Sequence, residues 1–142
     1  HFPLGCQAEH YRKTLGPRMV SLITKMGHSH PAGWNPPDSY AFAKSVVETG
    51  MPWGKSTAAA TKNGFALATF ASKKPIDRAV LISTTDKGFT GTRKWVETPA
   101  SLDVFNGTVA STSAPLPAGT TAWYINAYAD TLTLTSDYQE IK

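Results

Sequence analysis

The chain has 142 residues, of which 41% are hydrophobic and 17% charged, and its formal net charge is +4. This balance is that of a globular protein and excludes an intrinsically disordered chain. The sequence has no apolar run of the about 18 residues that a membrane-spanning helix needs. Its positive charges are scattered rather than clustered, so we expect neither a membrane nor nucleic acid as a partner.

The first predicted element is an amphipathic helix over residues 4–15. Its apolar positions recur at helical spacing: Leu4, Ala8, Tyr11 and Leu15. Gly16 and Pro17 end it. Cys6 lies in this helix, where we expect a small buried side chain. Because it is the only cysteine, an intrachain disulfide and a cysteine-rich zinc site are excluded.

Residues 18–25 form a short apolar run rich in β-branched side chains, which predicts a buried strand. Residues 36–49 predict a helix, with Asn35 as its N-cap and residues 50–52 at its end. The segment 26–34 therefore joins the end of a strand to the start of a helix. In α/β proteins, ligands and catalytic groups gather at that edge of the sheet.

From about residue 58 the helical period gives way to short β-rich runs. These runs are 64–72, 78–84, 93–98, 101–105, 107–113, 120–128 and 131–138. Asn106-Gly107 between two of them is typical of a hairpin turn. About seven short strands in roughly 80 residues are typical of an immunoglobulin-like or fibronectin-like β-sandwich.

The fold class that these elements predict is α+β. Residues 1–55 would be the α–β–α end of a larger α/β fold, residues 56–63 a linker of small polar side chains, and residues 64–142 a β-sandwich. The first part is too small to bury a core alone. Its strand at 18–25 would present unpaired edges, which predicts self-association, strand exchange or binding to a missing part of the fold.

Two histidines in the segment 26–34 are the candidate catalytic residues. A triad histidine sits on a loop, because one ring nitrogen must reach a serine while the other meets a carboxylate. His28 directly follows Gly27, which permits a tight backbone turn, so we favour His28 as the general base and keep His30 as the alternative. The rest of the supporting loop is Ser29, Gly33 and Trp34.

Other roles for these histidines remain open. One alternative is that both are ordinary surface residues. A His-x-His pair can bind a metal, but further ligands are needed and only His1 and His10 remain. Residues 50–56 resemble a phosphate-binding loop, yet only three residues separate their glycines and the segment leaves a helix instead of entering one. We therefore expect no metal and no cofactor.

The predicted strand 120–128 carries aromatic residues on both faces. Strand alternation places Trp123 and Ile125 on one face and Tyr124, Asn126 and Tyr128 on the other. The second face either binds a sugar or packs against a neighbouring part of the protein. Packing is the commoner role for such residues. A large apolar face is usually covered, and one that stays exposed usually marks the binding surface of a partner.

Three segments, taken in this order and spacing, resemble the C-terminal end of bacterial α/β hydrolases: His1–Leu4, Gly27–Trp34 and Pro37–Ala43. The resemblance is to the acetyl xylan esterase-like, cephalosporin-C deacetylase-like and dienelactone hydrolase-like proteins. Segments of the β-rich part resemble the sandwich that follows the hydrolase domain in many of these proteins: 75–81, 84–88, 93–95 and 116–121. The resemblance implies the C-terminal end of an α/β-hydrolase fold in residues 1–55.

The resemblance also implies that His28 is the triad histidine of a secreted or periplasmic serine esterase. Its substrate would be an ester, such as an acetylated polysaccharide. The nucleophile motif Gly-x-Ser-x-Gly is absent from the sequence, and in such hydrolases the serine and the acid precede the histidine. We therefore expect the chain alone to be inactive. The alternative is a non-catalytic β-sandwich module that binds a carbohydrate or a protein.

Overall fold

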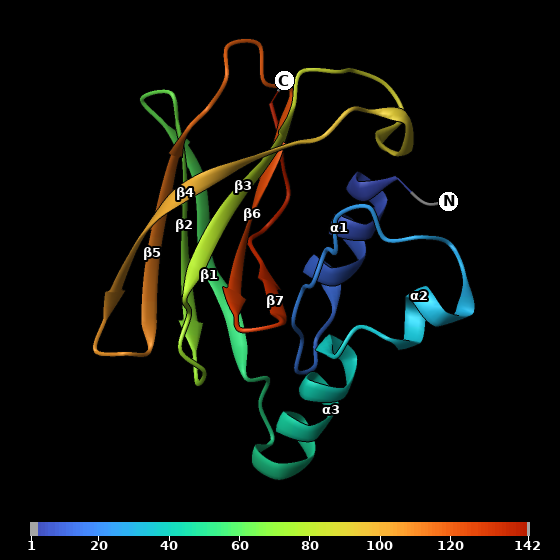
Figure 1. The fold of residues 1–142 in the computed structure, drawn as a ribbon, viewed down its shortest axis with the longest axis vertical. Coiled ribbons are helices and arrows are strands. Elements are labelled where there is room, and N and C mark those ends of the chain that lie inside the picture. The colour runs from blue at the N-terminus through green and yellow to red at the C-terminus, as the bar shows by residue number, and fades with distance from the viewer. Residues whose placement is uncertain (1–2, 142) are drawn as a thin grey trace.

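The computed structural model describes residues 3–141, and it is a barrel of antiparallel strands with a helical segment along one side (Figure 1). The helical segment comprises α1 (Leu4–Lys13), α2 (His30–Trp34) and α3 (Asp38–Thr49). The strands are β1 (Gly54–Lys62), β2 (Phe65–Ser72), β3 (Arg78–Thr84), β4 (Val96–Phe105), β5 (Val109–Pro115), β6 (Ala122–Ala129), β7 (Leu132–Thr135) and β8 (Gln139–Glu140), with a 3-10 turn η1 (Thr90–Thr92) before β4. In the described part of the chain, no helix is long and apolar enough to cross a membrane.

The strands form one curled sheet. Their hydrogen-bonded order is β1-β2-β5-β4-β3-β6-β7, with β8 paired to β6. β4 connects the two halves, because Val96–Ala100 pairs with β3 and Ser101–Phe105 pairs with β5. β1 and β7 end the order and come close to each other, so the sheet is a nearly closed barrel. The expected fold class, an α/β-hydrolase end followed by an immunoglobulin-like or fibronectin-like sandwich, is wrong, because the strands form one curled sheet. The barrel is consistent only with the coarse expectation of a sandwich-like β fold.

The barrel interior combines small alanines with a few large side chains. β2 alternates between outward and buried positions, so Ala66, Ala68 and Phe70 lie in the core. Trp123 of β6 is fully buried among them, and its Nε1 donates to Thr61 Oγ1 of β1 at 3.0 Å. Small residues facing a tryptophan let the curled sheet close around it at the density of a normal core.

The strand β6 is buried on both faces. One face belongs to the barrel core, and Tyr124 on the other face packs with Ala8 of α1 and Tyr138. The alternation expected for residues 120–128 is therefore confirmed. The face that carries Tyr124 and Asn126 packs against the helical segment of the same chain, and both residues are buried there.

Polar contacts attach α1 to the barrel. The helix buries only Ala8. Tyr11 Oη donates to Asp137 Oδ1 at 2.8 Å, and Arg12 Nε and Nη2 each donate to the same carboxylate at 3.0 Å. Cys6 is exposed, so the expectation of a buried cysteine is wrong. The reason is that the contact with the barrel is too narrow to cover more of this helix.

The expectation that residues 1–55 form the end of an α/β-hydrolase fold is wrong. Residues 18–25 belong to no strand, and the sheet contains no parallel pair among the described residues. The segment runs beside β7, where Thr135 N donates to Val20 O at 2.8 Å. Its apolar residues Met19 and Leu22 are partly buried against the two core clusters. The free strand edges that predicted self-association are therefore not found there.

The predicted linker 56–63 is mostly strand, since Gly54–Lys62 is β1. β1 is exposed at most of its positions and consists mainly of small and polar residues, so it lacks the β-rich character by which the other strands were predicted. Asn63 and Gly64 have φ of 51° and 77° and make the turn into β2, as the Asn-Gly pair requires. The division of the chain into two domains stays a prediction.

The remaining elements agree with the sequence except at their ends. The Asn106-Gly107 hairpin is confirmed, with φ of 51° and 67°, and joins β4 to β5. The runs 93–98 and 101–105 are a single strand, because Pro99 lies opposite Val80 within the β3–β4 ladder without ending it. α3 begins at Asp38 instead of residue 36.

Candidate functional site

The two histidines lie on a loop whose base is closed by a hydrogen bond. Ser21 Oγ donates to Asp38 Oδ1 at 2.9 Å, and Thr133 N of β7 donates to the same oxygen at 2.6 Å. Asp38 is only 6% exposed and is the first residue of α3, where its charge also suits the helix dipole. Residues 22–37 therefore form a loop that begins and ends at one point on the barrel, like an Ω-loop.

The entry to this loop is fixed to β6 and β7. Leu22 N donates to Thr135 Oγ1 at 2.8 Å, and Asn126 Nδ2 donates to Leu22 O at 2.9 Å. Thr135 Oγ1 in turn donates to Asn126 Oδ1 at 2.7 Å. Asn126 is fully buried, so its two polar atoms are satisfied inside the protein by this network. The start of the loop is thus attached to β6 and β7 by a buried network of hydrogen bonds.

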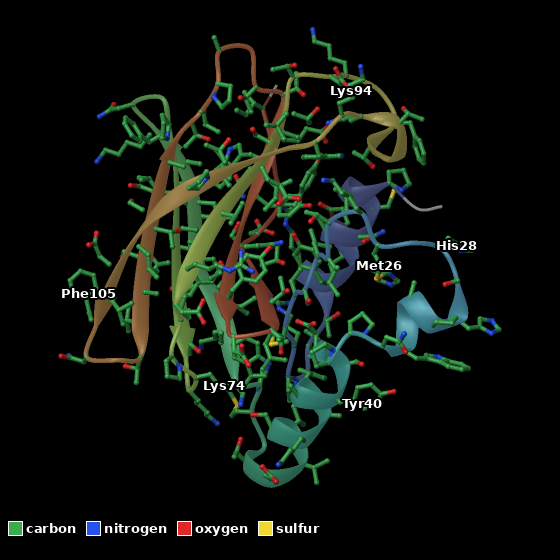
Figure 2. All side chains as sticks on the ribbon, viewed as in Figure 1. Met26, His28, Tyr40, Lys74, Lys94 and Phe105 are labelled. Atoms are coloured by element: carbon green, nitrogen blue, oxygen red, sulfur yellow. The ribbon has the colours of Figure 1, made fainter. Side chains whose placement is uncertain are left out.

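His28 lies at the outer part of the loop, away from the barrel, where Figure 2 shows it beyond Met26. It is exposed. His30 is the first residue of α2, and its ring stacks on Trp34 with centroids 5.3 Å apart and an angle of 24° between the planes. The structure therefore separates the two histidines: His30 takes part in a ring contact within α2, whereas His28 precedes that helix.

The other predicted loop residues have local roles. Ser29 caps α2, because its Oγ accepts from Ala32 N at 3.2 Å. Gly27 has no positive φ, and a Cβ at this position would make only an ordinary van der Waals contact. The expectation that a tight backbone turn requires glycine here is therefore wrong. The left-handed residue is Lys25, with φ of 57°. Gly33 has open space around it.

The described residues contain no group of three His, Cys, Asp or Glu side chains that could hold a metal ion. The hydroxyl of Ser29 is engaged in the cap of α2, and the carboxylate of Asp38 is engaged at the base of the loop. Neither is placed as a nucleophile or acid for His28. His1 and Phe2, with which the family resemblance begins, lie outside the described residues.

Large apolar side chains are exposed around the histidine loop and α3. Met26, Trp34, Tyr40 and Val47 are each more than half exposed. Figure 2 shows Met26, His28 and Tyr40 on the same side of the molecule, away from the strands. Apolar patches of this kind usually mark contact surfaces for another polypeptide. The sequence does not predict this patch, because apolar residues such as Tyr40 and Val47 in a helix usually face the core, whereas here they are exposed.

A cleft of about 450 Å³ lies between the loop entry and the barrel. Its lining includes Lys25 and Met26 from the loop, and Trp95 and Tyr124 from the barrel, whose rings are 5.6 Å apart. Burial raises the pKa of Tyr124, and the nearby charges of Tyr128 and Glu97 raise it further. The Tyr124 hydroxyl is therefore neutral at physiological pH and can act as a hydrogen-bond donor.

Sequence reasoning missed the contacts that position the loop. In the sequence, Asp38 has only the position of an acid in the first turn of the predicted helix, and nothing in the pattern indicates that it meets Ser21 and β7. A scan against protein-family models finds no match to this chain, and no curated protein matches it. The resemblance to ester hydrolases therefore remains a prediction from the residues quoted above.

Proposed function

We propose that this chain is the histidine-bearing portion of a serine ester hydrolase, to which it contributes His28. The observation that carries the proposal is the placement of this residue. His28 is exposed on a loop whose base is fixed by Asp38, Ser21 and Thr133, so another polypeptide segment can reach it without unfolding the barrel. The family resemblance of residues 27–43 supports the same assignment.

The proposed role of His28 is that of a general base. One ring nitrogen accepts the proton of a serine hydroxyl while the serine oxygen attacks the ester carbonyl, and the histidine then returns the proton to the departing alcohol. Water subsequently hydrolyses the acyl-serine by the same proton transfers in reverse order. The serine, and the carboxylate that orients the second ring nitrogen, would come from polypeptide outside these 142 residues. No α/β-hydrolase fold in residues 1–55 is part of this proposal.

The substrate class follows from the resemblance alone. It is an ester, such as an acetylated polysaccharide, and the enzyme would act outside the cytoplasm, as a secreted or periplasmic protein. The exposed side chains Met26, Trp34 and Tyr40 would then pack against the polypeptide that supplies the serine. This packing would remove apolar surface from water and bring the nucleophile to His28.

A second candidate function is a non-catalytic interaction module. The same exposed apolar side chains favour it, because a partner surface needs no catalytic histidine. The two candidates differ in one respect. Catalysis requires the imidazole of His28, whereas a docking surface requires the apolar side chains around it.

Covalent labelling distinguishes the two candidates. The natural polypeptide that contains this sequence, with any chain that co-purifies with it, is treated with a fluorophosphonate, which reacts with activated serines. We expect one labelled serine outside the 142 residues, and slow labelling in the His28→Ala variant. The His30→Ala variant is the matched control and should be labelled at the normal rate. Absence of labelling, or equal rates in His28→Ala and the unaltered protein, would favour the interaction module.

A further inference from the structure

β1 leaves one of its two edges without a partner strand. It has nine residues and pairs with β2 along one edge. β7, which lies across the opening of the barrel, has four residues, and no ladder joins it to β1 within residues 3–141. Unpaired backbone N–H and C=O groups along a strand edge are a template for pairing with another strand.

A cleft of about 600 Å³ runs along the first part of this edge. One wall is Lys55–Ala59 of β1, and the other includes Arg18–Val20. The backbone of the second wall already bonds to β7, because Val20 O accepts from Thr135 N. Of the two walls, only β1 is a strand, and no ladder within residues 3–141 covers its edge on the side of the cleft.

The regular part of the edge carries small side chains. A bulge interrupts the register between Ser56 and Ala58, and from Ala58 to Lys62 the pairing with β2 is continuous. Ala59 packs against the core, and Thr61 accepts from Trp123 Nε1, so these two residues face the barrel. Alternation then places Ala58, Ala60 and Lys62 on the outside. Short side chains on both faces leave the backbone accessible to an added strand.

The charge around this edge is positive. Asp137 is the acidic residue in the lining of the cleft, and Tyr11 and Arg12 already hold its carboxylate. Arg18 Nη1 donates to the backbone carbonyls of Arg12 and Thr14, so its positive charge is not neutralised by a carboxylate. Within the described residues Lys55 is in no ion pair either, and Lys62 is exposed at the far end of β1. A strand that enters here with carboxylates at its ends would meet uncompensated cations.

The same charges disfavour a second copy of this chain as the occupant. In the antiparallel register that pairs the full length of residues 55–62 with the same residues of another copy, Lys55 would lie opposite Lys62 of that copy. Like charges directly opposite each other destabilise a strand pair. The bulge at residues 56–58 also shortens the regular stretch that two copies could share.

We propose that the free edge of β1, residues 58–62 with the adjoining cleft, binds an extended acidic segment of another protein by strand addition. The backbone hydrogen bonds supply affinity, and the cations at both ends of the edge select the sequence. Side chains of the added strand that face the barrel lie beside Ala59 and Thr61 and must be small or β-branched. The proposal does not depend on the histidine loop or on ester hydrolysis.

A synthetic peptide of alternating threonine and valine with a glutamate at each end is the probe for this test. It is titrated into isotope-labelled protein and followed by NMR. We expect shifted signals and slowed amide exchange at residues 58–62, with affinity about tenfold lower for a peptide ending in lysines. The variant Lys62→Glu should weaken binding of the glutamate peptide by a similar factor. Lys87 is an exposed lysine beyond β3, and the variant Lys87→Glu should leave this binding unchanged.

Backbone methylation of the peptide separates strand addition from simple charge attraction. Two versions carry N-methyl groups on alternate residues, in the two possible frames. An added strand uses one of its edges, so one version should lose binding and the other should keep it. If both methylated peptides kept their binding to the protein, or if both lost it, the proposal would be overturned. A dimer of this chain, detected by light scattering, that protects residues 58–62 from exchange would also overturn it.

Discussion

Ser21 and Asp38, which lie on either side of the histidine loop, are joined by a hydrogen bond of 2.9 Å. Asp38 also accepts from the backbone of Thr133 in β7. One buried carboxylate therefore connects the loop entry, the start of α3 and the barrel. This arrangement explains how a loop with exposed glycines and histidines keeps a fixed position on the protein.

Replacement of Asp38 should destabilise the protein. Asp38→Ala leaves the amide of Thr133 and the hydroxyl of Ser21 without their acceptor in a buried place, which costs about 1–3 kcal/mol of unfolding free energy. Asp38→Asn keeps a carbonyl oxygen at this position and should lose less unfolding free energy than Asp38→Ala. Urea unfolding of the three proteins measures the difference. Equal stability of Asp38→Ala and the unaltered protein would show that the contact does not hold the loop.

Alkaline pH should weaken the attachment of α1. Burial raises the pKa of Tyr11 to about 12, although the hydrogen bond from the Tyr138 amide opposes the shift. The unfolded chain has the usual tyrosine pKa of about 10. Between pH 10 and pH 12 the unfolded state therefore loses its proton first, and stability falls as the pH rises.

The variant Tyr11→Phe tests this assignment. It removes the ionisable group and the bonds to Asp137 and Tyr138, so it should be less stable at pH 7 and should show a shallower loss of stability from pH 10 to 12. Tyr40→Phe, which alters an exposed tyrosine, is the control and should keep the original slope. The slopes are compared by measuring the unfolding free energies of the three proteins in urea between pH 10 and pH 12. An unchanged slope in Tyr11→Phe would refute the role given to Tyr11.

Two glycines should respond in opposite ways to alanine. A Cβ on Gly54 would lie 2.7 Å from Leu134 Cδ2, and Leu134 is fully buried, so Gly54→Ala should destabilise the barrel by about 1–3 kcal/mol. Gly33 in α2 has open space around it, so Gly33→Ala should be neutral or stabilising by about 1 kcal/mol through helix propensity. Thermal unfolding of both variants provides the comparison. A neutral Gly54→Ala would mean that β1 and β7 are less tightly packed.

The sequence predicted the strands whose signals are local. The β-rich run 64–72 and the turn at Asn106-Gly107 are marked by residues that are neighbours along the chain, and both are confirmed. β1 was missed because its small and polar residues are typical of a linker, although Gly54–Lys62 is an edge strand. The run 18–25 was assigned to a strand because its residues are apolar and β-branched. In the structure they gain their contacts from the barrel surface instead of a ladder.

The candidate site was predictable only in part. Its residues His28, His30 and Trp34 are marked by their types and spacing, and the structure places His28 on an exposed loop and the other two in the short helix α2. The bond between Ser21 and Asp38 is not predictable, because it depends on how two distant segments meet β7. The serine and acid of the proposed reaction lie outside the sequence, so no pattern within it can locate them.

The most direct test of the central claim is the kcat/KM for 4-nitrophenyl acetate of the natural polypeptide that contains this sequence, compared with its His28→Ala and His30→Ala variants. If His28 is the triad base, His28→Ala lowers kcat/KM at least about a thousandfold, as removal of a triad histidine does, while His30→Ala stays within about tenfold. A loss of less than tenfold for His28→Ala, or equal losses for the two histidines, would contradict the account.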